Sequence, residues 1–224
     1  MVAALINALK LVDKKIEDIK IVINGAGAAG ISICRYLLSY GAQNVLICDR
    51  KGIICEGDEG LNPAQEDISH CANKEHVHGL LKDAMVGADV FIGVSGPNCV
   101  TPEMIKSMNE KSIVFPLANP VPEINPDLAK EAGAYIIGTG SSEYANQINN
   151  VLVFPGLFRG AIDARAKTIN REMMVAASEG IASCVSKEEL NRDFILPYPY
   201  DKRAHVCVAE KVKEAAIRTG VVKK

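Results

Sequence analysis

Three glycines stand at the spacing Gly-x-Gly-x-x-Gly in the run INGAGAAG, which ends at Gly30. In such a run the first glycine permits a tight turn, the second lets a ligand's pyrophosphate approach the backbone, and the third lets a helix pack closely. The N–H groups and dipole at the start of the following helix favour a negative charge. The pattern therefore predicts a dinucleotide site made by Gly25, Ala26, Gly27, Ala28, Ala29 and Gly30.

An acidic residue follows at the distance that this kind of site requires. Asp49 lies 19 residues after Gly30, at the end of a predicted strand over residues 44–48, where its carboxylate can accept hydrogen bonds from the hydroxyls of an adenine ribose. Asp49 favours NAD, because it would repel the 2′-phosphate of NADP. Arg50 and Lys51 follow directly and partly offset that repulsion, so both cofactors stay open. Under the alternative interpretation, the glycines serve packing and Asp49 is a hydrated strand end.

Polar loops follow three further predicted strands. Ligands of doubly wound sheets bind outside the carboxyl ends of the strands, so Ser95, Gly96 and Asn119 are expected at the cofactor edge. Asn149 and Asn150, in the loop after the last strand, offer amides suited to a small carboxylate and hydroxyl, and we expect them to bind substrate. Any one of these asparagines can instead serve only its turn.

The elements that must position these residues alternate between apolar β-rich runs and helical patterns, which predicts an α/β fold. We expect a Rossmann-type, doubly wound, mostly parallel sheet with helices on both faces, in three parts: a leading helix within 1–18, a core over 19–160 and a C-terminal helical extension over 161–224. The expected strands are 19–23, 44–48, 89–94, 112–117 and 134–138. The expected helices are 2–11, 28–40, 63–72, 74–85, a short one from 101, 125–132, 161–185 and 204–219, and residues 186–189 have the form of a capping box.

Composition and charge limit the kinds of molecule that this protein can be expected to bind. A net charge of −2 provides no basic surface for nucleic acid, and no apolar run approaches the length of a membrane span. The seven cysteines are scattered, without a Cys-x-x-Cys pair, which is typical of a reduced, cytoplasmic protein.

Two other clusters of polar residues carry a weaker signal. Neither has the spacing of a metal site, and we expect both to be solvated surface rather than metal ligands. The first is His70, Cys71, His76 and His78, on an expected pair of amphipathic helices, and the second is Glu56, Asp58 and Glu59.

Several runs together resemble the nicotinamide-binding half of the malic enzymes, in particular the short microbial form also called malate oxidoreductase. These runs, in family order and spacing, are KIVINGAGAAGISI, CDRKG, EGDEGLNP, GADVFIGVSGPNCVTPEMI, ANPVPEI and NQINNVLVFPGLFRGAID. The resemblance implies oxidation of L-malate by NAD(P)⁺ and decarboxylation to pyruvate and CO₂ with Mg²⁺ or Mn²⁺. It implies that Asn119 lies beside the nicotinamide and that Asn150 contacts the substrate.

The chain departs from the family pattern in two ways. The loop over residues 141–145 lacks the arginine, aspartate and proline that the family usually has there. The family's catalytic tyrosine and lysine and its metal-binding carboxylates belong to a segment that would precede this chain, so no catalytic residue and no metal ligand is assigned. We therefore expect the chain to bind the cofactor without turning over malate alone, and to form a homodimer through apolar surface near residues 2–11.

Two alternatives to this function remain. The chain can be a non-catalytic dinucleotide-binding module that pairs with a separate catalytic chain or senses redox state. It can also be the terminal domain of another dehydrogenase, acting on an amino acid or on methylenetetrahydrofolate, although the run from Asn146 to Ala161 disfavours this.

Overall fold

The computed structural model describes residues 1–223, and their contacts divide the chain into two compact units. One unit is the continuous segment Val12–Tyr144, here called the sheet unit. The other, the helical unit, combines Met1–Leu11 with the chain from Ala145 onward. These boundaries differ from the three-part subdivision expected from sequence, because the first helix and the C-terminal helices contact each other.

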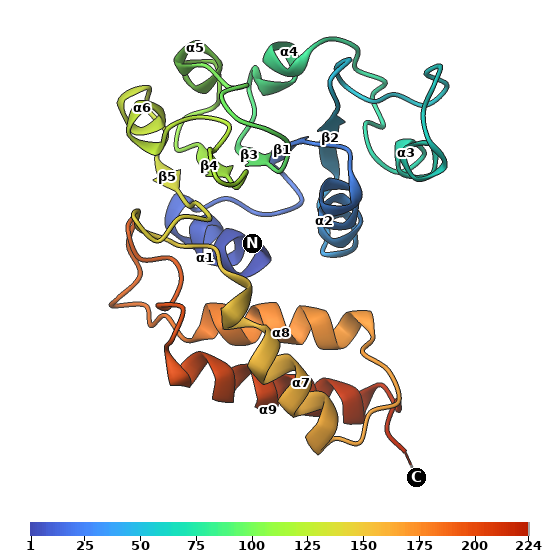
Figure 1. The fold of residues 1–224 in the computed structure, drawn as a ribbon, viewed down its shortest axis with the longest axis vertical. Coiled ribbons are helices and arrows are strands. Elements are labelled where there is room, and N and C mark those ends of the chain that lie inside the picture. The colour runs from blue at the N-terminus through green and yellow to red at the C-terminus, as the bar shows by residue number, and fades with distance from the viewer. Residues whose placement is uncertain (224) are drawn as a thin grey trace. The chain divides into compact units, whose positions relative to one another are not determined.

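The sheet unit contains a five-stranded parallel sheet of order β2-β1-β3-β4-β5 (Figure 1). Its all-parallel pairing confirms the predicted fold class. The strands are β1 (Lys20–Asn24), β2 (Asn44–Cys48), β3 (Val90–Gly93), β4 (Ile113–Pro116) and β5 (Ile136–Ile137).

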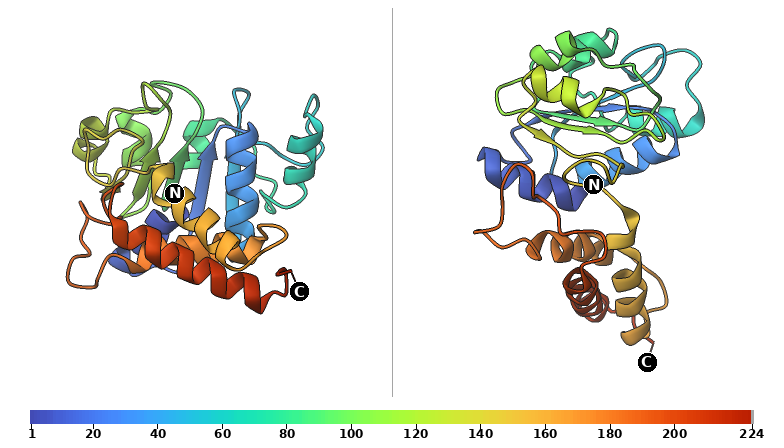
Figure 2. Two further views of the ribbon diagram at one scale, coloured as in Figure 1. Left: turned by 60° about the horizontal axis from the view of Figure 1, so that its bottom comes forward. Right: turned by 60° about the vertical axis from the view of Figure 1, so that its left-hand side comes forward.

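Apolar side chains cover both faces of this sheet, as the near-continuous apolar runs predict. Val22, Phe91 and Val114 point to one face, where they pack in a single buried cluster with the helices α4 (Leu81–Met85), α5 (Pro102–Lys106) and α6 (Pro126–Glu131). The helix α2 (Ala28–Ser39) contacts β1 and β2 and lies on the opposite face (Figure 2). Helices therefore cover both faces of the sheet.

The other helices of the sheet unit are short, and most begin at a capping side chain. The side chains of Asn62, Thr101 and Asn125 each accept a backbone N–H at a helix start, and a proline follows each of them. These helices are α3 (Pro63–Ser69), α4 (Leu81–Met85), α5 (Pro102–Lys106) and α6 (Pro126–Glu131).

The helical unit packs its helices closely around α9. Gly156 and Gly160 of α7 face α9, and a Cβ at Gly160 would lie 2.4 Å from the carbonyl oxygen of Ala209. The elements of this unit are α1 (Val2–Val12), of which Val12 falls in the sheet unit, the 3₁₀ turn η1 (Asn150–Leu152), α7 (Phe154–Asp163), α8 (Arg171–Ser183) and α9 (Lys202–Arg218). Buried Asn7 ties α1 to this unit by donating to the carbonyls of Ala182 and Ile195, both at 2.9 Å.

Two expected helices are wrong in part. Residues 74–80 are not helical, because Asn73, His76 and Gly79 have positive φ and the buried Asn73 side chain bonds to the loop at Val77. The expected long helix 161–185 is two helices. The positive φ of Arg165 ends the first, and a new cap at Asn170 begins the second.

Two smaller features complete the comparison with the expected elements. Ser186 and Glu189 make the expected reciprocal hydrogen bonds, but the turn that they close does not continue into a helix. Among residues 1–223, the helices are all too short or too polar to cross a membrane.

Candidate functional site

The strand order places the glycine run at the point where the connections leave the sheet in opposite directions. From β1 the chain passes through α2 to β2, whereas from β3 it passes through α5 to β4 on the other side. In open parallel sheets the crevice at such a switch point is where ligands bind. The loops that begin at Gly25 and Ser95 therefore flank the expected binding crevice.

Gly25 and Gly30 are required by the packing of the turn itself. Gly25 has φ +123°, and a Cβ there would lie 2.6 Å from the carbonyl oxygen of Val94. A Cβ at Gly30 would lie 1.7 Å from the carbonyl oxygen of Gly25, so that the helix can pack on the turn only without a side chain. The N–H of Gly25 donates to Cys48 at 2.9 Å, which ties the turn to the end of β2.

Gly27 is different, because no atom lies within 4 Å of the place where its Cβ would be. It is the N-cap residue of α2, and no side chain caps this helix. Gly27, Ala28 and Ala29 are exposed, whereas Ala26 is buried beneath them. An open glycine at an uncapped helix N-terminus can accept an anionic group such as a pyrophosphate.

Asp49 directly follows β2 and is therefore adjacent to the glycine turn. Its Oδ1 accepts hydrogen bonds from the N–H groups of Lys51, at 2.7 Å, and Gly52, at 3.3 Å, which fixes the carboxylate in a turn. Asp49 also borders a pocket of about 400 Å³ that the loops around residues 58–61 and 78–80 complete. Arg50 is exposed beside it, and the Lys51 ammonium lies over Gly60. The acid thus stands where the pattern predicts it.

The loop after β3 is joined to the ends of its neighbouring strands. Asn24, at the end of β1, donates from Nδ2 to the Ser95 hydroxyl at 2.8 Å. The Ser95 N–H donates to buried Glu123 at 2.9 Å. A Cβ at Gly96 would meet no atom within 4 Å, so this side of the crevice is open as well.

Asn119 is exposed at the end of β4 and borders a pocket of about 210 Å³ together with Thr139, Gly140 and Tyr144. A Cβ at Gly140 would lie 2.8 Å from the Asn119 Nδ2 atom. The backbone of Gly140 thus makes room for the Asn119 amide, which the structure places beside this pocket.

Asn149 and Asn150 belong to the helical unit, whereas Asn119 belongs to the sheet unit. The Asn149 side chain accepts a hydrogen bond from the N–H of Val151 at 3.0 Å and caps η1. Asn150 is exposed in the first position of that turn. One of the two predicted substrate residues therefore has an evident structural task.

The histidines and acids that we did not expect to bind a metal make contacts in pairs. The Nδ1 atom of His70 lies 2.9 Å from Glu56, and that of His76 lies 3.5 Å from the Cys55 thiol. Asp58 accepts the N–H of Cys55 at 2.8 Å. Residues 1–223 contain no group of three or more His, Cys, Asp or Glu that could hold a metal ion.

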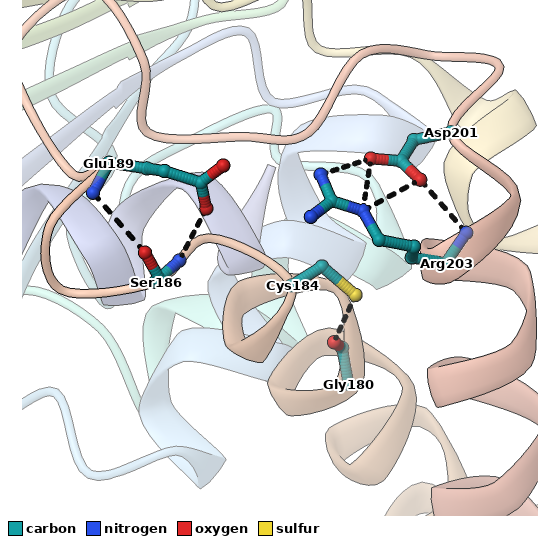
Figure 3. Close-up of polar contacts among 6 residues, drawn as sticks. All are labelled: Gly180, Cys184, Ser186, Glu189, Asp201 and Arg203. Atoms are coloured by element: carbon teal, nitrogen blue, oxygen red, sulfur yellow. Dashed lines mark hydrogen bonds and ion pairs between the residues drawn. The ribbon is translucent and has the colours of Figure 1, made fainter.

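Two buried thiols, one in each unit, are poor nucleophiles. Burial raises the pKa of Cys48 to about 12, and the neighbouring Asp49 adds to this effect. In the helical unit, burial and then Cys207 raise the pKa of Cys184 to about 12, and its thiol donates to the Gly180 carbonyl (Figure 3). With these raised pKa values both thiols stay protonated at neutral pH, and they are poor nucleophiles because the thiolate is the reactive form.

The remaining polar contacts of this region cap or brace helices. The Arg203 guanidinium lowers the pKa of Asp201, which caps α9 (Figure 3). Figure 3 also shows Ser186 and Glu189 bonded to each other. All of these groups are engaged in local structure.

The fold and this arrangement of glycines and acid define a dinucleotide-binding domain. The family model described as "Malic enzyme, NAD binding domain" matches residues 1–217. The chain therefore belongs to the malic enzyme family, of which it comprises the NAD-binding domain.

Curated relatives and solved structures agree with this assignment. The chain is 51% identical over 223 residues to the bifunctional malic/malolactic enzyme of Bacillus subtilis (strain 168), covering 99% of the chain and 54% of the relative. It is 42% identical over 236 residues to the NADP-dependent malic enzyme of Escherichia coli (strain K12), covering 98% of the chain and 31% of the relative. The crystal structure of the NAD-dependent malic enzyme from Thermotoga maritima superposes with a TM-score of 0.89 at 47% identity, covering 95% of this chain and 56% of that one. The chain thus spans about half the length of these relatives, or less.

Four residues that shape the carboxyl edge of the sheet, without facing the expected ligand, were not predicted from the sequence. Glu123, Asn24 and Gly93 are buried at the strand ends, and Gly140 underlies Asn119. A glycine inside a predicted buried strand, such as Gly93, was the available signal, because it marks a close approach of another group.

Proposed function

We propose that the strand ends of the sheet unit bind NAD⁺ or NADP⁺, with Gly25–Gly30 at the pyrophosphate and Asp49 at the adenine ribose. Ser95, Gly96 and Asn119 then contact the nicotinamide side. The observation that carries this proposal is the open space at Gly27, at an uncapped helix N-terminus beside Asp49.

NAD is favoured over NADP in this proposal. The carboxylate of Asp49 would accept hydrogen bonds from the ribose hydroxyls and would repel a 2′-phosphate. The N–H groups of Lys51 and Gly52 hold this carboxylate in place. Exposed Arg50 reduces this repulsion, so we expect a preference for NAD rather than exclusion of NADP.

Within a complete malic enzyme, this domain would serve the oxidation of L-malate and its decarboxylation to pyruvate and CO₂. We propose that Asn149 and Asn150 contact the substrate, and that the bound nicotinamide accepts the hydride. The base, the acid and the ligands of Mg²⁺ or Mn²⁺ would come from the family's other domain or from a partner chain. The described residues provide no metal-binding cluster, so we assign them no metal-dependent step.

The first test is a titration of the purified chain with NADH and NADPH, followed through the fluorescence of the reduced nicotinamide. Saturable binding with a preference for NADH is the expected result. Absence of binding to either cofactor would contradict the proposal. The chain has no tryptophan, so the nicotinamide signal is free of tryptophan emission.

The second test separates a domain that needs a partner from an enzyme that is complete. Malate, Mn²⁺ and each cofactor are added to the chain, and formation of the reduced cofactor is measured. We expect no turnover, and steady turnover would show that the chain has its own catalytic groups. We also propose that the protein is cytoplasmic and forms a homodimer. Light scattering of the same sample tests the homodimer.

A further inference from the structure

We propose that Glu123 is the positioning residue of the nicotinamide side of this site. It touches no proposed ligand atom, but it joins the two loops that carry Ser95 and Asn119. This inference rests on the proposed function, since it concerns how that site is held in shape.

The carboxylate of Glu123 is fully buried and accepts hydrogen bonds from two loops at once. Its Oε1 accepts the N–H of Ser95 at 2.9 Å, and its Oε2 accepts the N–H of Ala118 at 3.1 Å. Ala118 directly precedes Asn119. One side chain thus fixes the distance between the loop after β3 and the loop after β4.

The same link extends to the strand of the glycine turn. Asn24 at the end of β1 donates to the Ser95 hydroxyl, which lies 3.5 Å from Glu123 Oε1. The backbone adds a second connection, because the N–H of Val100 donates to the Glu123 carbonyl at 3.0 Å. Glu123 is therefore the centre of a network that connects the ends of three adjacent strands.

Gly93 provides the space that the carboxylate needs. A Cβ at Gly93 would lie 2.3 Å from the Glu123 Cδ atom, so the carboxylate lies directly against the end of β3. A buried carboxylate held in this way is costly to move, since its partners would lose their hydrogen bonds away from water.

The opposite edge of the same sheet contains a carboxylate with similar bonds and no proposed ligand. Asp89 accepts hydrogen bonds from the Lys14 ammonium at 2.7 Å, from the Lys20 N–H at 2.8 Å and from the Asn109 amide at 3.0 Å. It is 7% exposed and directly precedes β3, whereas the Glu123 carboxylate lies against the other end of that strand. Asp89→Asn is therefore a matched control for loss of a structural carboxylate.

The test compares two ligands that share the adenosine and pyrophosphate parts. NADH has the nicotinamide, whereas ADP-ribose lacks it. Calorimetry gives both dissociation constants for the wild-type chain and for the Glu123→Gln and Asp89→Asn variants. If the wild type prefers NADPH, NADPH and 2′-phospho-ADP-ribose take their places.

In Glu123→Gln, the new amide NH₂ faces the N–H of Ser95 or Ala118, so that one loop must move. We expect the affinity for NADH to fall by roughly tenfold, the effect of leaving one buried donor without a partner. The affinity for ADP-ribose is expected to stay within about twofold, because the glycine turn and Asp49 keep their own contacts. Asp89→Asn should lower the melting temperature and leave both affinities unchanged.

An equal loss for both ligands, no loss for either, or a selective loss in Asp89→Asn would overturn the inference. If Glu123→Gln does not fold, Glu123→Asp takes its place, since it keeps the charge but is too short to reach both loops. A wild-type chain that binds neither ligand would instead contradict the proposed function, and a chain that binds both with equal affinity would contradict the role of the nicotinamide side.

Discussion

Glycines recur at short spacing in two regions of this chain, and the space around them differs. Gly25 to Gly30 form a turn in the sheet unit, and Gly156 and Gly160 lie on one side of α7 in the helical unit. Each of the α7 glycines contacts α9, and a Cβ on either would meet α9 atoms at 2.4–2.8 Å. In the turn, Gly25 and Gly30 are equally crowded, but Gly27 faces empty space.

The difference shows what distinguishes a ligand turn from a packing contact. Crowded glycines make an arrangement of backbone possible, and they occur in both regions. Only a glycine whose missing side chain leaves open space allows a ligand to approach the backbone. The four substitutions below test this distinction, in order of decreasing expected effect.

Gly30→Ala should have the largest effect. Its Cβ would lie 1.7 Å from the Gly25 carbonyl oxygen, so α2 and the turn must separate. We expect the free energy of unfolding to fall by about 3 kcal/mol and NADH binding to be lost. Urea unfolding and NADH titration measure the two effects, and a stable variant with normal binding would contradict the packing role.

Gly160→Ala should destabilise the helical unit without changing the affinity of folded protein. Overpacking against Ala209 and Val212 costs about 1–3 kcal/mol, and the better helix propensity of alanine returns about 1 kcal/mol. A net loss of up to about 2 kcal/mol is therefore expected in urea unfolding. A large drop in NADH affinity, measured at a low urea concentration at which the variant is still folded, would show that the packing of α7 on α9 and the glycine turn are not independent.

Gly27→Ala should show the opposite behaviour. The new methyl group meets no protein atom but occupies the space proposed for the pyrophosphate. We expect the NADH affinity to fall by about tenfold, or about 1.4 kcal/mol, with a stability change of only about 0.5 kcal/mol at this N-cap. Gly160→Ala is the control, and unchanged binding in Gly27→Ala would mean that the open space is not used.

Asp49→Asn sharpens the comparison at the residue that completes the turn. Asparagine keeps an oxygen for the N–H groups of Lys51 and Gly52, so the turn should survive the loss of charge. Because charged acceptors bind hydroxyls more strongly, the NADH affinity should fall by about fivefold, while that for NADPH should not fall.

The control for this variant is Asp58→Asn. Asp58 also accepts a backbone N–H, that of Cys55, in a neighbouring loop, and its substitution makes the same change of charge. An equal shift in the ratio of NADPH to NADH affinity in both variants would rule out a specific role for Asp49.

Most of the fold could be predicted from sequence because its signals are local. The five strands are apolar runs. Three helices begin with a capping residue followed by a proline, and these capping residues are Asn62, Thr101 and Asn125. The errors occurred where single residues with positive φ override a helical pattern. Asparagine adopts positive φ more often than most residues, so Asn73 carries a weak signal, whereas Arg165 carries none.

The positions of two parts of the candidate site could also be predicted. The glycine run follows β1 and Asp49 follows β2, as their spacing predicts, and the Gly25 N–H joins the ends of these strands by donating to the Cys48 carbonyl. Their contacts with a cofactor stay a prediction. Glu123 was not predictable, because its importance depends on which loops meet at the strand ends. That Asn149 caps η1 also depends on a conformation that its sequence neighbours do not reveal.

The hydrogen bonds of Asn7 have a consequence for synthesis of the chain on the ribosome. Asn7 can bond to Ala182 and Ile195 only after the chain has been translated at least 188 residues beyond Asn7. The sheet unit, by contrast, is one continuous segment that ends at Tyr144, with every strand partner within it. Because continuous segments can fold during synthesis, the glycine turn can form before α1 makes its contacts with the rest of the helical unit.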